Sequence, residues 1–483
     1  MSVSRIIKIK EKYSTLSIAA KAGIWFVICS VIQKSFSLIT TPVFTRLLTK
    51  EQFGIYSVYL SWLQVFTIVC TFRLDFGVFN KGMTKYHDNK EEYTSSMQGI
   101  TTLLTITAFL AYLLFRKQIN QLTELSTTIT LFLFLELLFT PALNFWMIRQ
   151  RYDFHYRGVV FVTAAMSAAN FLIGLAAVIC MEDKGIARIL SCVIVQACFG
   201  MIFYLLNLSK SKKIWKWEYI KFAIIFNIPL IPHYFSSYIL DQSDRIMIQK
   251  MCGLESAALY SVAYNAGLVT KIIVNSINNA LIPWQYRKLE KGQYKAVAGQ
   301  MKSAGIMMAF AFLVFIALGP ELIRLMASEK YYDAVKVIPP VAASMFFVFL
   351  YSVFCNIEFF YDANKAAMII STIGAAANII LNYYCIPRFG YSAAGYTTLF
   401  CYLLFAGMHY VYVNKVVKAN TGSPLFSTSD LLAVSFAFLM FASVISVFYG
   451  NWIIRYLLIL GLVLTVVIKR KYLINIIKDI RDK

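Results

Sequence analysis

Long apolar runs follow one another through nearly the whole chain, with short polar connections between them. Each run is about 20 residues long, which is enough for a helix to cross the hydrocarbon core of a bilayer. The predicted spans are residues 19–40, 53–72, 98–115, 128–147, 159–180, 187–207, 222–247, 256–282, 304–326, 337–359, 366–386, 391–413, 429–449 and 452–468. This pattern predicts an all-α integral membrane protein with about fourteen transmembrane helices.

The composition excludes a soluble protein. Hydrophobic residues make up 59% of the 483 residues and charged residues only 14%, so a water-exposed fold would carry a large apolar surface. The predicted outer connections are about 15 residues long or shorter, which leaves little room for the catalytic groups of a polymerase or glycosyltransferase. The sequence also lacks a Gly-rich phosphate loop followed by Lys and Ser or Thr. We therefore expect a membrane protein that is not an enzyme and does not hydrolyse ATP.

The net charge of +22 is distributed according to topology. About 29 Lys and Arg residues lie in the amino-terminal segment, the even-numbered connections and the carboxy-terminal tail, against about 10 in the odd-numbered connections. By the positive-inside rule, both termini are predicted to be cytoplasmic. Because the cations do not form a single patch, nucleic acid is not expected as a partner. The first span has no small-residue cleavage site and is predicted to stay as a helix.

Two segments about 204 residues apart resemble each other. The Tyr-Ser-Val core of residues 55–59 recurs in residues 259–264, and residues 180–185 echo residues 385–390 at nearly the same offset. The hydropathy independently gives two sets of six spans. The predicted domains are an amino-terminal six-helix lobe at 1–210, a carboxy-terminal six-helix lobe at 211–418, and two additional transmembrane helices with a basic tail at 419–483.

Six spans per repeat is an even number, so the two lobes are predicted to run in the same direction through the membrane. A cavity between two such lobes can open to each side in turn, which is the physical basis of alternating access. Pro229 and Pro232 remove backbone donors from the seventh span, so that helix should bend or break. Pro141, Pro339 and Pro340 are further candidate hinges, for which static kinks are an equally consistent explanation.

Polar residues recur at helical spacing along several of the apolar spans. Such stripes predict helix faces that line a polar lumen. For any single residue the commoner role is a hydrogen bond between packed helices, so both readings stay open. The candidate lumen residues are Ser30, Ser37, Gln64, Asn170, Asn275, Asn278 and Asn378.

Charged residues inside the spans are harder to explain by packing. A Lys or Asp at the bilayer centre costs about 2.5–3.5 kcal/mol, so Lys34 and Lys271 should face water, a partner or a substrate. For Asp241 and Asp244, a local ion pair with Arg245 on the same helix is as consistent as a role in the lumen. The candidate residues for coupling to H⁺ or Na⁺ are Glu136, Asp241, Asp244 and Glu358.

Most of the nine cysteines lie within predicted spans, where they serve as small apolar packing residues. Their spacing matches no metal motif, so neither a disulfide nor a metal ion is expected. His233 in the seventh span is more simply a packing residue than a proton relay. Apart from a coupling ion, no cofactor is predicted.

Three motifs occur in order along the chain. They are Thr45, Arg46, Leu47, Glu51, Phe53, Gly54 and Tyr56 after the first span, then Asp244, Arg245, Met247 and Ile248 around the end of the seventh, and finally Asn378, Leu381, Asn382, Ile386, Pro387, Gly390, Ala393, Ala394 and Gly395 between the eleventh and twelfth. These motifs resemble the polysaccharide flippases of the multidrug/oligosaccharidyl-lipid/polysaccharide exporter (MOP) superfamily. The resemblance covers essentially the whole chain, and the two spans after the twelfth fit only some branches.

The resemblance implies two lobes in the V-shaped arrangement of the multidrug exporters called MATE. It implies a flippase that moves an undecaprenyl-diphosphate-linked oligosaccharide, such as an O-antigen or capsule repeat unit, across the bacterial inner membrane. By charge, Lys34 and Lys271 would contact the diphosphate, with Arg46 and Arg245 toward the outer side. The polar stripes would meet sugar hydroxyls. A polysaccharide polymerase or glycosyltransferases would be partners, along with membrane lipids.

The alternative is a cation-coupled multidrug antiporter of the same superfamily. Such a protein is expected to use acidic residues for cationic substrates, whereas Lys residues are prominent in the spans here. A channel is less consistent, because the sequence has no selectivity-filter motif and the repeat suggests two moving lobes.

Overall fold

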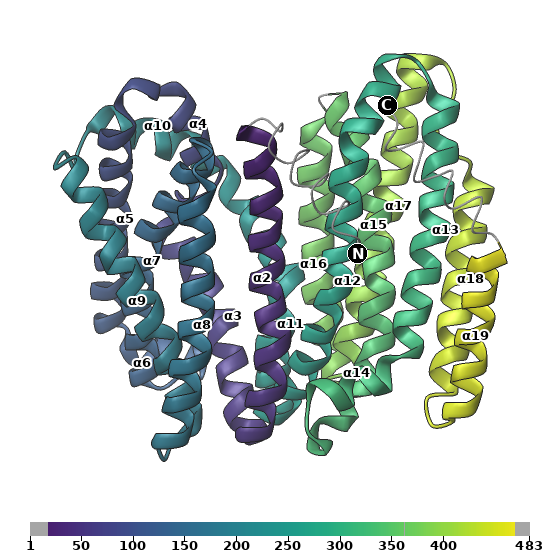
Figure 1. The fold of residues 1–483 in the computed structure, drawn as a ribbon, viewed down its shortest axis with the longest axis horizontal. Coiled ribbons are helices and arrows are strands. Elements are labelled where there is room, and N and C mark those ends of the chain that lie inside the picture. Colours follow the sequence, from purple (N-terminus) through teal and green to yellow (C-terminus); the bar gives the residue numbers. More distant parts are fainter. Residues whose placement is uncertain (1–17, 362, 469–483) are drawn as a thin grey trace, which may run out of the picture. The chain divides into compact units, whose positions relative to one another are not determined.

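The computed structural model describes the chain except for residues 1–17, 362 and 469–483. The described part contains helices and no strands (Figure 1). The first ten α-helices are α2 (Ile18–Leu47), α3 (Lys50–Thr71), α4 (Gly77–Lys85), α5 (Lys90–Leu114), α6 (Arg116–Thr123), α7 (Thr127–Tyr152), α8 (Tyr156–Cys180), α9 (Lys184–Lys210), α10 (Trp217–Asn227) and α11 (Ile231–Cys252). They are followed by α12 (Leu254–Glu290), α13 (Tyr294–Ala317), α14 (Gly319–Met326), α15 (Ile338–Phe360), α16 (Asn364–Phe389), α17 (Ala393–Thr421), α18 (Thr428–Val447) and α19 (Trp452–Ile468). The 3₁₀ segments are η1 (His87–Asn89), η2 (Ile228–Leu230) and η3 (Glu329–Val337).

The chain divides into two compact units. The amino-terminal unit comprises Met1–Thr40 and Leu47–Phe235, and the carboxy-terminal unit comprises Thr41–Arg46 and Ser236–Lys483. The short segment at the end of α2 therefore belongs with the second unit. The domain ranges 1–210, 211–418 and 419–483, and the V-shaped arrangement of the lobes, stay predictions.

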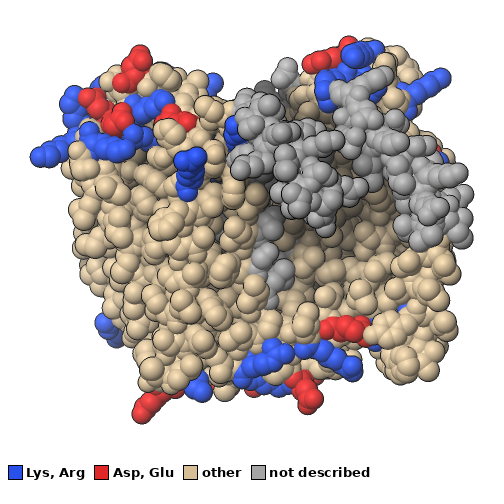
Figure 2. Space-filling model, in the orientation of Figure 1, with Lys and Arg blue, Asp and Glu red and all other residues tan. Residues whose placement is uncertain are grey.

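Ten helical segments in the described part of the chain are long and apolar enough to cross a membrane. They are α3, α5 with η1, α7, α8, α9, α12, α13, α15 with η3, α16 and α18. The helices α2, α11 and α17 do not meet this criterion, and α19 supplies a shorter apolar helix. The all-α membrane fold is thus confirmed, while the count of fourteen spans stays a prediction. In the amino-terminal unit, at the left of Figure 2, charged side chains gather near the helix ends and leave a surface with few charged side chains between them.

Local sequence signals explain where several helices begin and end. Thr49 caps α3 through a reciprocal pair of hydrogen bonds with Gln52, the arrangement known as a capping box. The Asp183 carboxylate accepts from the Ile186 amide at the start of α9. Gly390 and Gly422, which end α16 and α17, have φ of 75° and 80°, a conformation that residues with a Cβ rarely adopt.

Several prolines stand where helical segments begin, whereas Pro42, Pro141, Pro283 and Pro387 lie inside helices. The seventh predicted span is interrupted, because η2, which contains Pro229, separates α10 from α11. The ninth predicted span also divides, into α13 and α14, at Gly319 and Pro320. Pro339 and Pro340 occupy the first turn of α15, where a missing backbone donor costs nothing. They therefore stand at the junction of η3 and α15, and their role as hinges stays a prediction.

Each unit has its own apolar core. In the amino-terminal unit the rings of Phe79, Tyr86, Tyr93 and Tyr219 pack together, with ring centroids 4.5–5.6 Å apart within the group. In the carboxy-terminal unit, α15 is buried along most of its length, and its neighbours include α12, α13 and α17. Because α15 is covered on several sides, any polar group that it carries must find a partner within the protein.

Candidate functional site

Asp244 is the centre of a buried polar cluster in the carboxy-terminal unit. The residue lies on α11 and is 2% exposed. Its carboxylate accepts a hydrogen bond from the Tyr260 hydroxyl of α12. It also accepts from the Asn382 amide of α16, at 2.7 Å, and from the Thr398 hydroxyl of α17, at 2.9 Å. Four helices therefore converge on one carboxylate.

A second layer of oxygen atoms surrounds this carboxylate. Asn378 Oδ1 accepts from the Asn382 amide at 3.3 Å and from the Ser243 hydroxyl at 3.4 Å. Thr397 donates its hydroxyl hydrogen to Asn382 Oδ1. Carboxylate, amide and hydroxyl oxygens are the ligand types that hard cations prefer. The cluster can thus hold a proton or a small hard cation, and it brings the predicted residues Asp244 and Asn378 together.

Asp241, one turn before Asp244, forms an ion pair with Lys271 of α12. The Lys271 Nζ lies 2.8 and 2.9 Å from the two carboxylate oxygens, and the Tyr264 hydroxyl donates to Asp241 at 3.3 Å. The side chains of Lys271 and Asp241 are 30% and 36% exposed. Because this charged pair is only partly buried, a solute can reach it. Lys271 itself lies on α12, which is apolar enough to cross a membrane.

Arg245 does not pair with either aspartate of its own helix. Its guanidinium lies over the Tyr264 ring, 4.7 Å from the centroid, and its Nε donates to the Ser261 hydroxyl at 3.1 Å. A further bond runs from Nη1 to Gln242. Since Asp241 pairs with Lys271 across helices, the local ion pair that the spacing on one helix also allowed is not the one that forms.

The amino-terminal unit has polar centres of its own. Glu136 of α7 is 6% exposed and accepts a hydrogen bond from the Tyr59 hydroxyl of α3 at 2.6 Å. Arg188 of α9 donates to the Asn170 carbonyl of α8 at 3.2 Å and to the Tyr56 hydroxyl at 3.3 Å. The sequence predicted Glu136 and Asn170 but gave no signal for Arg188, which stands at the start of an apolar helix.

The remaining predicted residues lie apart from these clusters. Arg46 is exposed and donates to the carbonyls of Pro42 and Leu325. Asn278 accepts from the Asn356 amide at 2.7 Å. Gln64 and Asn275 are exposed. The side chains of Lys34, Ser30, Ser37 and His233 lie outside the described residues.

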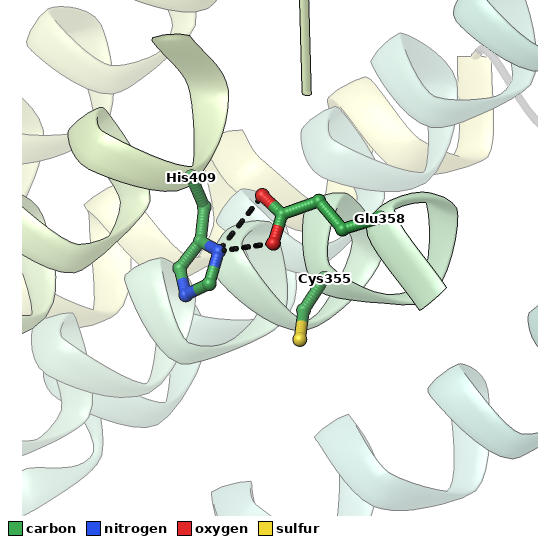
Figure 3. A group of neighbouring side chains, drawn as sticks. All are labelled: Cys355, Glu358 and His409. Atoms are coloured by element: carbon green, nitrogen blue, oxygen red, sulfur yellow. Dashed lines mark hydrogen bonds and ion pairs between the residues drawn. The ribbon is translucent and has the colours of Figure 1, made fainter. Parts of the chain in front are cut away.

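Glu358 of α15 has a partner that the sequence did not reveal. Nδ1 of His409 on α17 lies 2.9 and 3.0 Å from the two Glu358 oxygens, and Cys355 is close to both residues (Figure 3). His409 is 51 residues away in sequence, and helical periodicity cannot say which distant helix faces a given residue. The spacing of the cysteines, from which neither a disulfide nor a metal ion was expected, therefore could not reveal this group.

Residues 19–288, more than half of the chain, match the family model described as polysaccharide biosynthesis protein. A protein of the Lsg locus of Haemophilus influenzae is 26% identical over 219 residues, which cover 41% of this chain and 51% of that protein. An uncharacterized membrane protein of Methanocaldococcus jannaschii is 25% identical over 215 residues, 44% of this chain and 42% of that protein. The chain thus spans about half the length of the curated relatives it matches.

Solved structures of similar fold are transport proteins. The lipid II flippase MurJ, in an inward closed conformation, is similar over 93% of this chain and 100% of that chain, with a TM-score of 0.65 and 15% identity. A multidrug resistance MATE family transporter of the MOP superfamily, in an inward-facing conformation, is similar over 81% and 96%, with a TM-score of 0.58 and 10% identity. The chain is therefore a multi-pass membrane protein that has the fold of MOP superfamily transporters and belongs to the polysaccharide biosynthesis protein family.

Proposed function

We propose that this protein is a flippase that moves undecaprenyl-diphosphate-linked oligosaccharide repeat units, of the O-antigen or capsule type, across the bacterial cytoplasmic membrane by alternating access. The family description and the similarity in fold to a lipid flippase support this class of cargo. In this proposal both termini are cytoplasmic. Residues 1–210 and 211–418 are the two moving lobes, and residues 419–483 add two helices and a basic tail.

The observation that carries the proposal is the accessible cation Lys271 within the helices of the carboxy-terminal unit. A diphosphate needs positive charge along its path. An ammonium group inside an apolar helix is costly unless an anion or water stabilises it, so its presence there suggests a function. Lys271 is balanced by Asp241 at 2.8 Å. An arriving diphosphate can compete with this single carboxylate, so the ion pair keeps the cation stable when no cargo is present.

Further positive charge lies around Arg46. Arg46 and Arg324 line an open cavity of about 940 Å³ together with Ser328, Glu329 and Tyr332. In our proposal this cavity receives the diphosphate on the outer side, after Lys271 has released it. Arg245 and Lys34 complete the cationic path, and polar side chains such as Asn275 and Gln64 meet the sugars.

Coupling is proposed to reside in the buried acids. The Asp244 cluster offers oxygen ligands from four helices, so binding of H⁺ or Na⁺ there could favour one arrangement of α11, α12, α16 and α17. Glu136 and Glu358 are further candidates. A polymerase or glycosyltransferase acting on the same lipid would supply or consume the cargo.

The test is flipping of a fluorescent polyprenyl-diphosphate-linked oligosaccharide in proteoliposomes. Lys271→Ala should lower the rate more than about tenfold, which corresponds to about 1.4 kcal/mol. Lys271→Arg should retain part of it, because the charge remains. The matched control is Lys302→Ala, since Lys302 makes a similar 2.8 Å ion pair with Asp430 but is 48% exposed, in the third turn of α13.

Removing Lys271 alone leaves Asp241 without its cation, which could damage folding. The double variant Asp241→Asn with Lys271→Gln removes both charges and keeps a polar pair. If this double variant folds and flips the lipid at the wild-type rate, the cationic path is refuted. If flipping is lost in the double variant but kept in Lys302→Ala, the path is supported.

Multidrug antiport is the second candidate function. It is favoured by the similarity in fold to a MATE family transporter and by the buried acid Asp244. In this case the same proteoliposomes should transport a lipophilic cation such as ethidium in exchange for an ion that moves down an imposed gradient. Transport of ethidium without any flipping of the lipid-linked oligosaccharide would replace the proposed function with this one.

A further inference from the structure

Three side chains of metal-ligating type meet between α15 and α17. Cys355 and Glu358 are three residues apart on α15 and therefore share a face of the helix. His409 projects from α17 toward that face (Figure 3). One ligand atom from each residue, a thiol sulfur, a carboxylate oxygen and an imidazole nitrogen, lies within 4.8 Å of the other two.

We propose that Cys355, Glu358 and His409 form a binding site for a divalent transition-metal ion of the zinc class. Thiolate, imidazole and carboxylate are the three ligand types that zinc uses in proteins. In a tetrahedral zinc site the ligand atoms lie about 3.5 Å apart. Because the observed ligand atoms lie within 4.8 Å of one another, the group needs movements of about 1 Å to reach that spacing.

The orientation of the imidazole is already fixed. Its ring stacks on the Tyr351 ring, with centroids 5.8 Å apart and an interplanar angle of 23°. Phe405, one turn earlier on α17, packs against the ring edge at 6.3 Å. Support of this kind holds a metal ligand in position and raises the affinity of the site.

Burial and charge also fit a divalent ion. The side chains of His409 and Glu358 are 3% and 0% exposed. Glu358 and His409 bond to each other. Among the described residues the Cys355 thiol makes no hydrogen bond, so no bond to the protein occupies its sulfur. A thiolate, a carboxylate and a neutral imidazole together balance the two positive charges of the metal, and the complex is neutral inside the helices.

Binding exchanges protons for the metal ion. The Cys355 thiol loses its proton, and the imidazole nitrogen that binds must present its lone pair. No oxidant or reductant is needed. Three protein ligands leave the fourth tetrahedral position for water. The bound ion would tie α15 to α17 and so stabilise the carboxy-terminal unit.

The experiment is a titration of the purified, tag-free full chain in detergent after treatment with a chelator. Zn²⁺ should bind with a stoichiometry of one per chain in competition with a chromophoric chelator. Co²⁺ should give a thiolate-to-cobalt charge-transfer band in the near ultraviolet. Cys355→Ser and His409→Gln should each weaken Zn²⁺ binding more than about tenfold, and Cys355→Ser should abolish the charge-transfer band.

The matched control is Cys70→Ser, because Cys70 is also a buried thiol but belongs to no group of metal-ligating residues among those that the structure describes. This variant should bind Zn²⁺ like the wild type. The melting temperature should rise with Zn²⁺ for the wild type and Cys70→Ser, and not for Cys355→Ser. If His409→Gln does not fold, the cobalt spectrum of Cys355→Ser still shows whether the Cys355 thiolate binds the metal ion. Equal binding by wild type and Cys355→Ser, or no saturable binding at all, overturns the proposal.

Discussion

The two units place opposite charges next to similar tyrosines. Residues 55–59 and 259–264 resemble each other, and their first tyrosines, Tyr56 and Tyr260, correspond. Tyr56 accepts a hydrogen bond from the cation Arg188, whereas Tyr260 donates to the anion Asp244. A hydroxyl group can both accept and donate, so one residue type serves both partners. The similar segments therefore hold a positive centre in one unit and a negative centre in the other.

The second tyrosine of each segment holds an acid in both units, but the acids are balanced differently. Tyr59 donates to Glu136 at 2.6 Å, and Tyr264 donates to Asp241 at 3.3 Å. Asp241 also has the cation Lys271, while Glu136 has no ion pair among the described residues. A buried carboxylate without a cation depends on its hydrogen bond and on proton uptake. The comparison therefore favours the carboxy-terminal pair for the cargo contact that we propose and makes Glu136 the simpler candidate for proton exchange.

The largest expected effect comes from removing the negative centre. Asp244→Ala leaves the hydroxyls of Tyr260 and Thr398 without their acceptor and removes one of the two acceptors of the Asn382 amide. Each unsatisfied group costs about 1–3 kcal/mol. We expect a loss of about 3 kcal/mol or more in the free energy of unfolding, measured by denaturant titration in detergent. Asp430→Ala, which removes a carboxylate that is 47% exposed, should change it by less than about 1 kcal/mol. Equal effects of the two substitutions would contradict the central role of Asp244.

The second largest effect on the free energy of unfolding is expected from changing the positive centre, Arg188. Arg188 is 3% exposed, contacts Tyr56, Asn170 and Ser191, and lies over the Tyr56 ring at 4.9 Å from the centroid. A lysine cannot reproduce this fork of donors, so Arg188→Lys should cost about 1–2 kcal/mol. Arg245→Lys should cost less, because Arg245 has fewer hydrogen-bond partners. The same denaturant titration measures both variants, and a larger loss for Arg245→Lys would break the comparison.

The third prediction separates the acids by function. Glu136→Gln keeps an acceptor for Tyr59, so the free energy of unfolding should fall by no more than about 1 kcal/mol. The same variant should flip lipid at a rate that no longer responds to an imposed proton gradient. Asp244→Asn is the comparison variant, and its rate should lose any response to a Na⁺ gradient. An unchanged response to protons in Glu136→Gln would refute the role of that residue.

The sequence predicted features that arise within a single helix, such as its position in the chain and the residues that share one of its faces. Apolar length gave the helices, and Pro229 marked the interruption between α10 and α11. Helical spacing placed Asp241 and Asp244 on one stripe, and both lie in polar clusters. Asp244 and Asn378 belong to two different motifs, and the structure brings these motifs together.

Contacts between helices could not be predicted in the same way. The partners Glu136 and Tyr59 are 77 residues apart, and Lys271 and Asp241 are 30 apart. The period of a helix states which of its residues share a face, but says nothing about the helix that this face meets. The sequence predicted that Lys271 faces water, a partner or a substrate, but it did not reveal that the partner is Asp241. The contact between His409 and Glu358 was missed for the same reason.

The smallest expected effect is on how the melting temperature depends on pH. It involves one charged residue near a helix end in each unit. The Arg455 guanidinium donates two hydrogen bonds of 2.7 Å to Glu321 of α14 and holds the pKa of that carboxyl below its usual value. In the amino-terminal unit, a hydrogen bond to the Tyr219 hydroxyl raises the pKa of Lys216 before α10. A lowered carboxyl pKa stabilises the fold above the unfolded value of about 4.3 and stops doing so as the pH falls through the folded pKa. A raised lysine pKa stabilises the fold below about pH 10.4 and stops doing so as the pH rises through the folded pKa.

Glu321→Gln should therefore reduce the fall of the melting temperature between about pH 5 and pH 3. Lys216→Met should reduce the fall of the melting temperature at alkaline pH and leave the fall at acid pH unchanged. Both changes are expected to be small, because Glu321 and Lys216 are 31% and 37% exposed and water screens such pairs. The measurement is the melting temperature in detergent across the pH range. If Glu321→Gln altered only the alkaline side, the ion pair with Arg455 could not be the source of the acid sensitivity, since the sign of the carboxyl shift allows a loss only toward low pH.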